Sequence, residues 1–185
     1  MTTANTNSIF QGSMFSFIKR RDYALMHRIH HWPAPDWLRW TLIYSSKGGD
    51  GWLWYTLGVV ILIFGDHLRF RAVAAGLVAT GLGLAIYQIV KKTTRRKRPC
   101  LIEPHEWAGV QPPDQYSFPS GHTIASFAIA TSVGLFYPSL MPALFCCAIM
   151  IATSRIMLGM HFLSDVLVGV MIGTALGYTA FLFIH

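Results

Sequence analysis

The sequence is short of charged residues, and especially of acidic ones. Only 12% of its 185 residues are Asp, Glu, Lys or Arg, whereas a soluble domain carries roughly 25%. Eight residues are acidic, 15 are Lys or Arg, and 53% are hydrophobic. This composition argues against a soluble protein and predicts one membrane-embedded domain over residues 1–185. The net charge of +7 comes largely from basic residues beside an apolar run, so no nucleic-acid partner is expected.

Cysteine is also scarce. Cys100, Cys146 and Cys147 form no disulfide framework and lack the spacing of metal ligands, so neither a metal nor a cofactor is expected. No signal peptide is expected, because residues 1–13 are polar and residues 19–31 are too charged for an apolar core. The apolar segments are therefore expected to be permanent anchors.

Five apolar runs are candidates for transmembrane helices. A helix needs about 20 apolar residues to cross the hydrocarbon layer, within a range of about 17–25, and the first and third runs are shorter than that. The pattern predicts an all-α integral membrane bundle of about five transmembrane helices. The predicted spans are Gly51–Phe64, Ala72–Val90, His122–Tyr137, Leu140–Leu158 and Leu163–Ile184.

The segments outside the spans have their own patterns. Residues 1–12 are expected to be a loose tail, and residues 14–46 to form helices in the membrane interface. The segment from 14 to 31 mixes apolar and basic side chains, which is typical of an interfacial helix and equally of an amphipathic helix packed on the bundle. Tryptophans at 32, 37 and 40 favour the headgroup zone. Residues 91–120 contain five prolines and are expected to form a loop at the active face.

Counting the spans brings three separate motifs to one membrane face. Successive spans run in opposite directions, so the end of the second, the start of the third, the end of the fourth and the start of the fifth meet there. We therefore expect the functional site on this face. The motifs at these ends are Lys91-x6-Arg98-Pro99, Pro119-Ser120-Gly121-His122 and Ser154-Arg155-x5-His161-x3-Asp165.

Five residues of these motifs suit the binding of a phosphate group. Lys91, Arg98 and Arg155 would supply cations, and a guanidinium fork matches phosphate oxygens in pairs. Ser120 and Gly121 begin a helix, where free backbone N–H groups form an anion site. The sequence therefore predicts a phosphate cradle on this face.

Three further residues suit phosphoryl transfer. His161 and Asp165 are four residues apart and share one helix face, so Asp165 is expected to accept the Nδ1 proton and leave Nε2 free to attack phosphorus. His122 would protonate the leaving oxygen. An acid in a membrane span is costly, which favours a function for Asp165. Each residue taken alone has an ordinary explanation, such as a helix cap, but the ordered set favours a catalytic site.

The three motifs resemble the signatures of the type-two phosphatidate phosphatase family, which is related to vanadium haloperoxidases and bacterial acid phosphatases. The resemblance runs from Lys91 to Asp165. It implies a helical core and metal-independent hydrolysis of a lipid phosphate or pyrophosphate. The roles it implies are nucleophile for His161, general acid for His122, orienting group for Asp165, and phosphate binding for Lys91, Arg98, Ser120, Gly121 and Arg155.

Several alternatives stay open from the sequence. The lipid could be polyprenyl pyrophosphate, phosphatidate, phosphatidylglycerophosphate or lipid A. The same site could act as a lipid phosphotransferase or, holding vanadate, as a haloperoxidase, and a non-enzymatic membrane scaffold is the remaining hypothesis. The oligomeric state has no signature in the sequence.

The expected location is a bacterial inner or plasma membrane, but the orientation has two opposing arguments. Of the 15 Lys and Arg residues, all but Arg69 and Arg71 fall on the active face, and the positive-inside rule places such a face in the cytoplasm. Analogy with bacterial relatives that act on cell-envelope lipids favours the outer face. The site itself needs cations, so both orientations stay open.

Overall fold

The computed structural model describes residues 6–105, 112 and 114–185. These residues form an all-helical chain, which confirms the predicted fold class. The elements are α1 (Thr6–His30), α2 (Asp36–Gly48), α3 (Trp52–Phe64), α4 (Arg69–Thr94), the short 3-10 helix η1 (Pro99–Leu101), α5 (Gly121–Phe136), α6 (Met141–Met157) and α7 (Leu163–Ile184).

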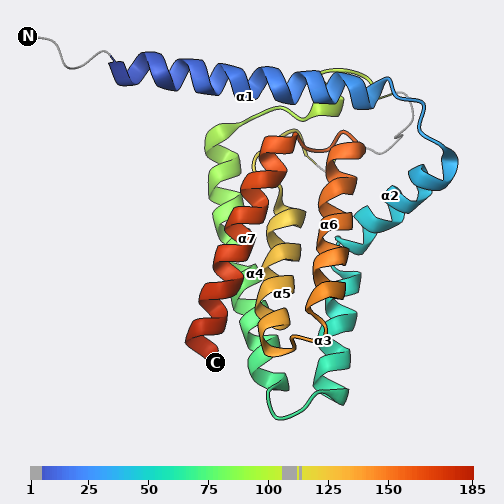
Figure 1. Ribbon diagram of the computed structural model, residues 1–185, viewed down its shortest axis with the longest axis vertical. Helices are drawn as coiled ribbons and strands as arrows, with labels where there is room; N and C mark the ends of the chain where they lie inside the picture. The colour runs from blue at the N-terminus through green and yellow to red at the C-terminus, as the bar shows by residue number, and fades with distance from the viewer. Residues whose placement is uncertain (1–5, 106–111, 113) are drawn as a thin grey trace, which may run out of the picture.

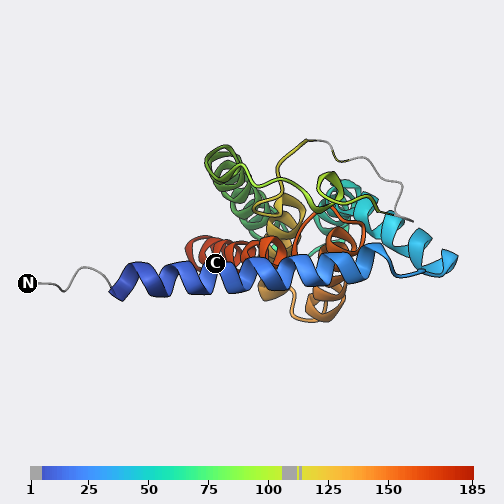
Figure 2. The same cartoon turned by 90° about the horizontal axis from the view of Figure 1, so that it is seen from above.

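The helices form an upright bundle with one helix across its end. Helices α3 to α7 run along a common direction, and α1 lies across one end of them (Figure 1). Seen from above, α1 crosses the whole width of the bundle (Figure 2). Helix α2 descends from the α1 end and leads into α3 (Figure 1). The amphipathic N-terminal segment therefore packs on the bundle, and Met26 and Ile29 of α1 are buried there.

Helix α5 is the centre of the bundle, because its neighbours α4, α6 and α7 all pack on it. Glycines on α7 let that helix approach the α5 backbone closely. A Cβ atom at Gly173 would lie 2.5 Å from the Ile124 carbonyl oxygen, and one at Gly177 would lie 2.5 Å from the Ala128 oxygen. Small residues of this kind bring membrane helices together. The start of α7 is thereby held beside the start of α5.

The outer faces of the bundle are apolar, as expected of helices in contact with lipid. Leu77 on α4 is 66% exposed and Phe183 on α7 is 87% exposed. Among the described residues, α4 and α7 are the helices long and apolar enough to cross a membrane. The other three predicted spans are also apolar helices, but α3 has 13 residues, which corresponds to about 20 Å.

Two predicted boundaries were wrong. Helix α1 begins at Thr6, so residues 6–12 are not a loose tail; residues 1–5 of that prediction lie outside the described part. Helix α4 continues to Thr94, so Lys91 belongs to the helix and not to the loop predicted for 91–120. Residues 106–111 and 113 of that loop are also outside the described part.

Candidate active site

The structure brings the eight predicted residues to the end of the bundle that α1 covers. They come from the last turn of α4, the segment after it, the first turns of α5 and α7, the end of α6 and the link between α6 and α7. The Ser120 N–H donates to the Asp165 carbonyl at 3.2 Å, which joins two of the three motifs. Arg98, Ser120, Arg155, His161 and Asp165 are each at most 4% exposed.

His161 lies in the link between α6 and α7, and its two ring nitrogens have different neighbours. Nδ1 is 2.5 Å from the Ser117 carbonyl oxygen, which can only accept a hydrogen bond, so Nδ1 carries the proton. Nε2 is 3.1 Å from Arg98 Nη1, which can only donate. Nε2 therefore presents a lone pair. Burial, followed by the charges of Arg155 and Arg98, lowers the pKa of His161 well below its usual value.

Asp165 does not make the hydrogen bond that the sequence predicted. Its Oδ2 is 3.8 Å from His161 Nδ1, beyond hydrogen-bonding distance. The same oxygen accepts the Phe162 N–H at 2.9 Å, and Oδ1 lies 2.6 Å from Arg96 Nη1. The Ser117 carbonyl fixes the imidazole instead, while Asp165 anchors the backbone next to it.

Arg96 links this anchor to α1. One nitrogen of its guanidinium contacts Asp165, and the other lies 2.7 Å from Asp22 Oδ2. Asp22 is 4% exposed, and its Oδ1 also accepts the Ser164 N–H at 3.1 Å. The Arg96 guanidinium also lies over the Phe162 ring, 4.0 Å from its centroid. Arg96 and Asp22 were missed because the sequence showed them only as parts of a basic run and a charged segment.

Two of the predicted phosphate binders share one carboxylate. Asp114 Oδ2 lies 2.6 Å from Lys91 Nζ and 3.0 Å from Arg98 Nη2. Burial acts to raise the pKa of Asp114, but hydrogen bonds from Lys91 and the Tyr116 N–H, together with the charge of Arg98, lower it overall. The Asp114 carboxylate therefore lies between these two cations. The sequence offered no signal for Asp114.

Arg155 retains donor capacity. Its Nη1 donates to Ser46 Oγ at 2.5 Å, and its buried Nε has no hydrogen-bond partner among the described residues. A buried unsatisfied donor is costly. Arg155 Nε is therefore a donor still available to a ligand.

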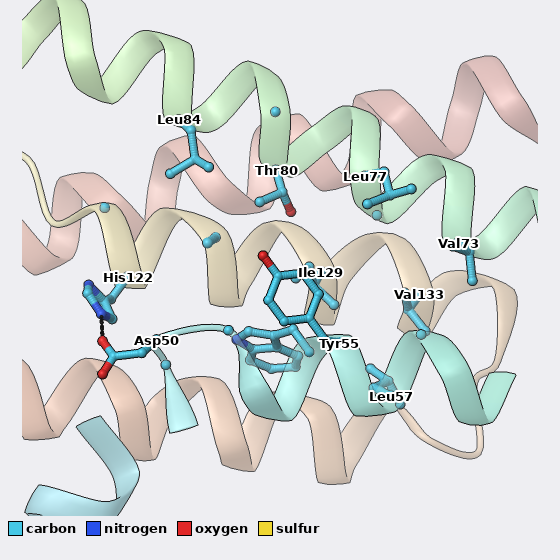
Figure 3. A pocket seen from close by; sticks show the side chains of 18 of the residues that line it. Asp50, Tyr55, Leu57, Val73, Leu77, Thr80, Leu84, His122, Ile129 and Val133 are labelled. Atoms are coloured by element: carbon cyan, nitrogen blue, oxygen red, sulfur yellow. Dashed lines mark hydrogen bonds and ion pairs between the residues drawn. The ribbon is translucent and has the colours of Figure 1, made fainter. Parts of the chain in front are cut away.

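His122 stands at the first turn of α5, beside the turn between α2 and α3. Its Nε2 lies 2.7 Å from Asp50 Oδ1, a contact drawn in Figure 3. The structure thus pairs Asp50, from the turn before α3, with the predicted general acid. The aspartate accepts from His122 and fixes the orientation of the ring.

A cleft of about 540 Å³ begins at His122 and runs between α3, α4 and α5. Figure 3 shows His122 and Asp50 at one end and Val73 and Val133 at the other. Apolar side chains and glycines form most of its walls. A Cβ atom added at Gly58 or Gly81 would meet nothing within 4 Å, so both glycines border open space. The polar site therefore continues into an apolar channel.

Similar proteins include a decaprenylphosphoryl-5-phosphoribose phosphatase of Mycobacterium tuberculosis, 39% identical over 98 residues that make up 50% of each chain. The chain spans about half the length of the curated relatives it matches. The crystal structure of Aquifex aeolicus LpxE is similar with a TM-score of 0.68 and 29% identity, covering 85% of this chain and 92% of that one.

A transmembrane PAP2 type phosphatidylglycerolphosphate phosphatase of Bacillus subtilis has the same fold, with a TM-score of 0.71 at 21% identity, covering 90% of this chain and 85% of that one. The family model described as the PAP2 superfamily matches residues 72–185. This match spans more than half of the chain and includes all eight predicted site residues. The chain therefore belongs to the PAP2 superfamily and is a membrane protein.

Proposed function

We propose that the chain is a membrane phosphatase that hydrolyses a lipid phosphate or pyrophosphate through a phosphohistidine on His161. One observation carries the proposal: Nε2 presents its lone pair to the buried Arg98, and the proposed general acid His122 lines the polar end of an apolar cleft. The Nδ1 proton is already committed to the Ser117 carbonyl. The imidazole is thus held in the tautomer that a nucleophile needs.

The cations beside Nε2 would bind the phosphate. Its oxygens would displace the Asp114 carboxylate from Lys91 and Arg98 and accept the free donor of Arg155. The N–H groups at the start of α5 would bind further oxygens. These donors favour the charge that spreads over the phosphoryl oxygens in the transition state.

The reaction would take two displacements. In the first, Nε2 bonds to phosphorus, the bond from phosphorus to the lipid oxygen breaks, and that oxygen leaves with a proton from His122. In the second, His122 takes a proton from water, the water oxygen bonds to phosphorus, and the phosphorus–nitrogen bond breaks. The products are the lipid alcohol, or lipid monophosphate, and inorganic phosphate. Asp50 serves as a positioning residue because it fixes the His122 ring.

Asp165 and Arg96 would act through the backbone of the nucleophile. Asp165 accepts the N–H of Phe162, the residue directly after His161, and Arg96 ties the carboxylate to α1. A nucleophile held to within about 0.5 Å loses little entropy when it reacts. We assign both as positioning residues.

The cleft supports a substrate with a long apolar chain. Its polar end contains His122 and Asp50, and its apolar part follows α3 and α4 toward Val133. A phosphate that reaches both His161 and the proposed acid His122 would leave the attached chain at the polar end of this cleft. The named relatives act on lipid or polyprenyl phosphates, and this chain is proposed to act on the same chemical class.

The test is phosphate release from a panel of lipid phosphates in detergent, with a chelator present. The wild-type protein should release phosphate, and His161→Ala should lose about 10³-fold or more of the rate, as expected when a nucleophile is removed. Lys92→Ala, an exposed change one residue from the phosphate-binding Lys91, is the matched control and should keep wild-type activity.

Rapid quenching in alkali should also trap an acid-labile phosphate on the wild-type chain but not on His161→Ala. Equal release by His161→Ala would refute the nucleophile. Wild-type protein that forms the labile phosphate, releases no inorganic phosphate to water, and passes the phosphoryl group to an added second lipid alcohol would instead identify a phosphotransferase.

A further inference from the structure

Four of the eight histidines of the chain gather away from the catalytic residues, where the end of α1 meets the segment after η1. His30 and His105 stack with ring centroids 4.2 Å apart, and His27 and His31 with centroids 4.3 Å apart. The proposed reaction uses none of these side chains. Their arrangement calls for a separate explanation.

Within this cluster, three donor groups converge. His27 and His31 are one turn apart on α1, and the Nδ1 atom of each faces the same oxygen, Glu103 Oε1, at 2.8 Å and 3.5 Å. The ligand atoms of the three residues all lie within 4.8 Å of one another. We propose that His27, His31 and Glu103 form a binding site for a divalent transition metal, with Zn²⁺ as the reference ion.

The distances suit tetrahedral coordination. Zinc binds imidazole nitrogen and carboxylate oxygen at about 2.0–2.2 Å, so neighbouring ligand atoms around a tetrahedral ion are about 3.3 Å apart. The two separations from Glu103 lie on either side of that value. His31 would exchange its present hydrogen bond to the His27 carbonyl, 3.0 Å long, for the metal. Only small side-chain movements are needed.

The chemistry and access also suit a metal. Two imidazoles and one carboxylate are a ligand set found with zinc, in which water occupies the fourth position. His27 and His31 are 66% and 47% exposed, and Glu103 is 24% exposed. An ion can therefore enter from solvent, and a water ligand has room.

A metal here would join α1 to the segment that follows the phosphate-binding Arg98. The Glu103 N–H donates to the Pro99 carbonyl at 3.1 Å, and the Cys100 N–H donates to the Gly159 carbonyl at 3.0 Å. The segment is therefore fastened to the link that carries His161. Metal binding would stabilise this junction, independently of the proposed hydrolysis, which needs no metal.

The test is a titration of the purified, detergent-solubilised chain, without a polyhistidine tag, with Co²⁺ followed by competition with Zn²⁺. The wild type should bind one equivalent, show the visible absorption of tetrahedral Co²⁺, and unfold at a higher temperature with the metal. His27→Ala and His31→Ala should each weaken binding by about tenfold or more, since even the loss of an outer partner of a metal ligand weakens binding 10- to 100-fold.

Two controls separate this site from others. His67→Ala removes an exposed histidine in the turn between α3 and α4, and His161→Ala removes the proposed nucleophile; both should bind the metal as the wild type does. Wild-type protein that binds no metal at micromolar concentration would overturn the proposal and leave an ordinary histidine–carboxylate contact. Unchanged binding by the His27→Ala/His31→Ala double variant, or loss of binding in His161→Ala, would overturn it as well.

Discussion

Filling the apolar cleft should lower kcat/KM for long-chain substrates much more than for short-chain substrates. Gly58 on α3 and Gly81 on α4 line the cleft, and a Cβ atom at either position would meet nothing within 4 Å, so we expect a leucine there to extend into the cleft. Leucine is also a better helix former than glycine by about 1 kcal/mol. The change should therefore leave folding intact while taking volume from the substrate chain.

The size of the effect follows from the carbon atoms displaced. A leucine side chain has four carbons, and each buried methylene contributes about 0.8 kcal/mol. Displacing four methylenes of the substrate costs about 3 kcal/mol, which is about 10²-fold in kcat/KM. Gly81 lies six residues before Tyr87, a cleft residue near the site, and therefore about 9 Å along α4 from it. A short alkyl chain would stop before Gly81.

The assay compares kcat/KM for a long-chain lipid phosphate and a butyl phosphate in the same detergent. Gly81→Leu should lose about 10²-fold with the long chain and little with butyl phosphate, and Gly81→Ala, which adds one methyl group, should lose about fivefold or less. Gly58→Leu tests the opposite wall in the same way. Equal losses on both substrates, or no loss on the long one, would refute the assignment of the cleft to the lipid chain.

Three further predictions concern the site. Arg96→Ala leaves the buried carboxylates of Asp22 and Asp165 without their cation, so we expect it to destabilise the detergent-solubilised chain by about 3–5 kcal/mol. The control Lys92→Ala should change the melting temperature very little. Equal melting temperatures for the two variants would contradict the ion pairs of Arg96 with these carboxylates. Asp50→Asn should lower kcat about tenfold with KM nearly unchanged, and Asp50→Glu should restore part of it; an effect on KM alone would argue for substrate binding instead. Because burial and the charges of Arg155 and Arg98 lower the pKa of His161, the proposed nucleophile should stay neutral as the pH falls through 6.5. The value of kcat/KM, corrected for titration of the substrate phosphate, should therefore not decline there. A tenfold loss per pH unit that starts at 6.5 would contradict this.

Helices and their order were predictable because they depend on local patterns. Apolar runs predicted α3 to α7, and the predicted starts at His122 and Leu163 agree with α5 and α7 to within one residue. Alternation of the spans then sufficed to bring the three motifs together. The boundary of α4 was missed because Lys91 and Lys92 ended the apolar run, while the backbone continued as a helix for another turn.

The hydrogen-bond and ion-pair partners of the site residues could not be predicted from the sequence. Asp22 and Asp50 contact the site from segments 74 and 72 residues away from their partners. A carboxylate in a polar segment gives no indication of which distant cation or imidazole it will meet. Arg96 shows the same limit for a cation. Six basic residues between 91 and 98 have similar chemistry, and only the fold shows that Arg96 is the one that pairs with Asp22 and Asp165.

The position of Asp165 shows why residue spacing alone assigned the wrong hydrogen-bond acceptor to His161, the proposed nucleophile. Four residues on a helix bring two side chains to one face, but Asp165 stands in the first turn of α7, where the unpaired Phe162 N–H competes for its oxygen. With Arg96 on the other oxygen, the carboxylate is occupied, and Nδ1 turns to the Ser117 carbonyl. A neutral carbonyl stabilises an imidazolium less than a carboxylate would. The arrangement therefore favours the neutral imidazole, which is the form that can attack phosphorus.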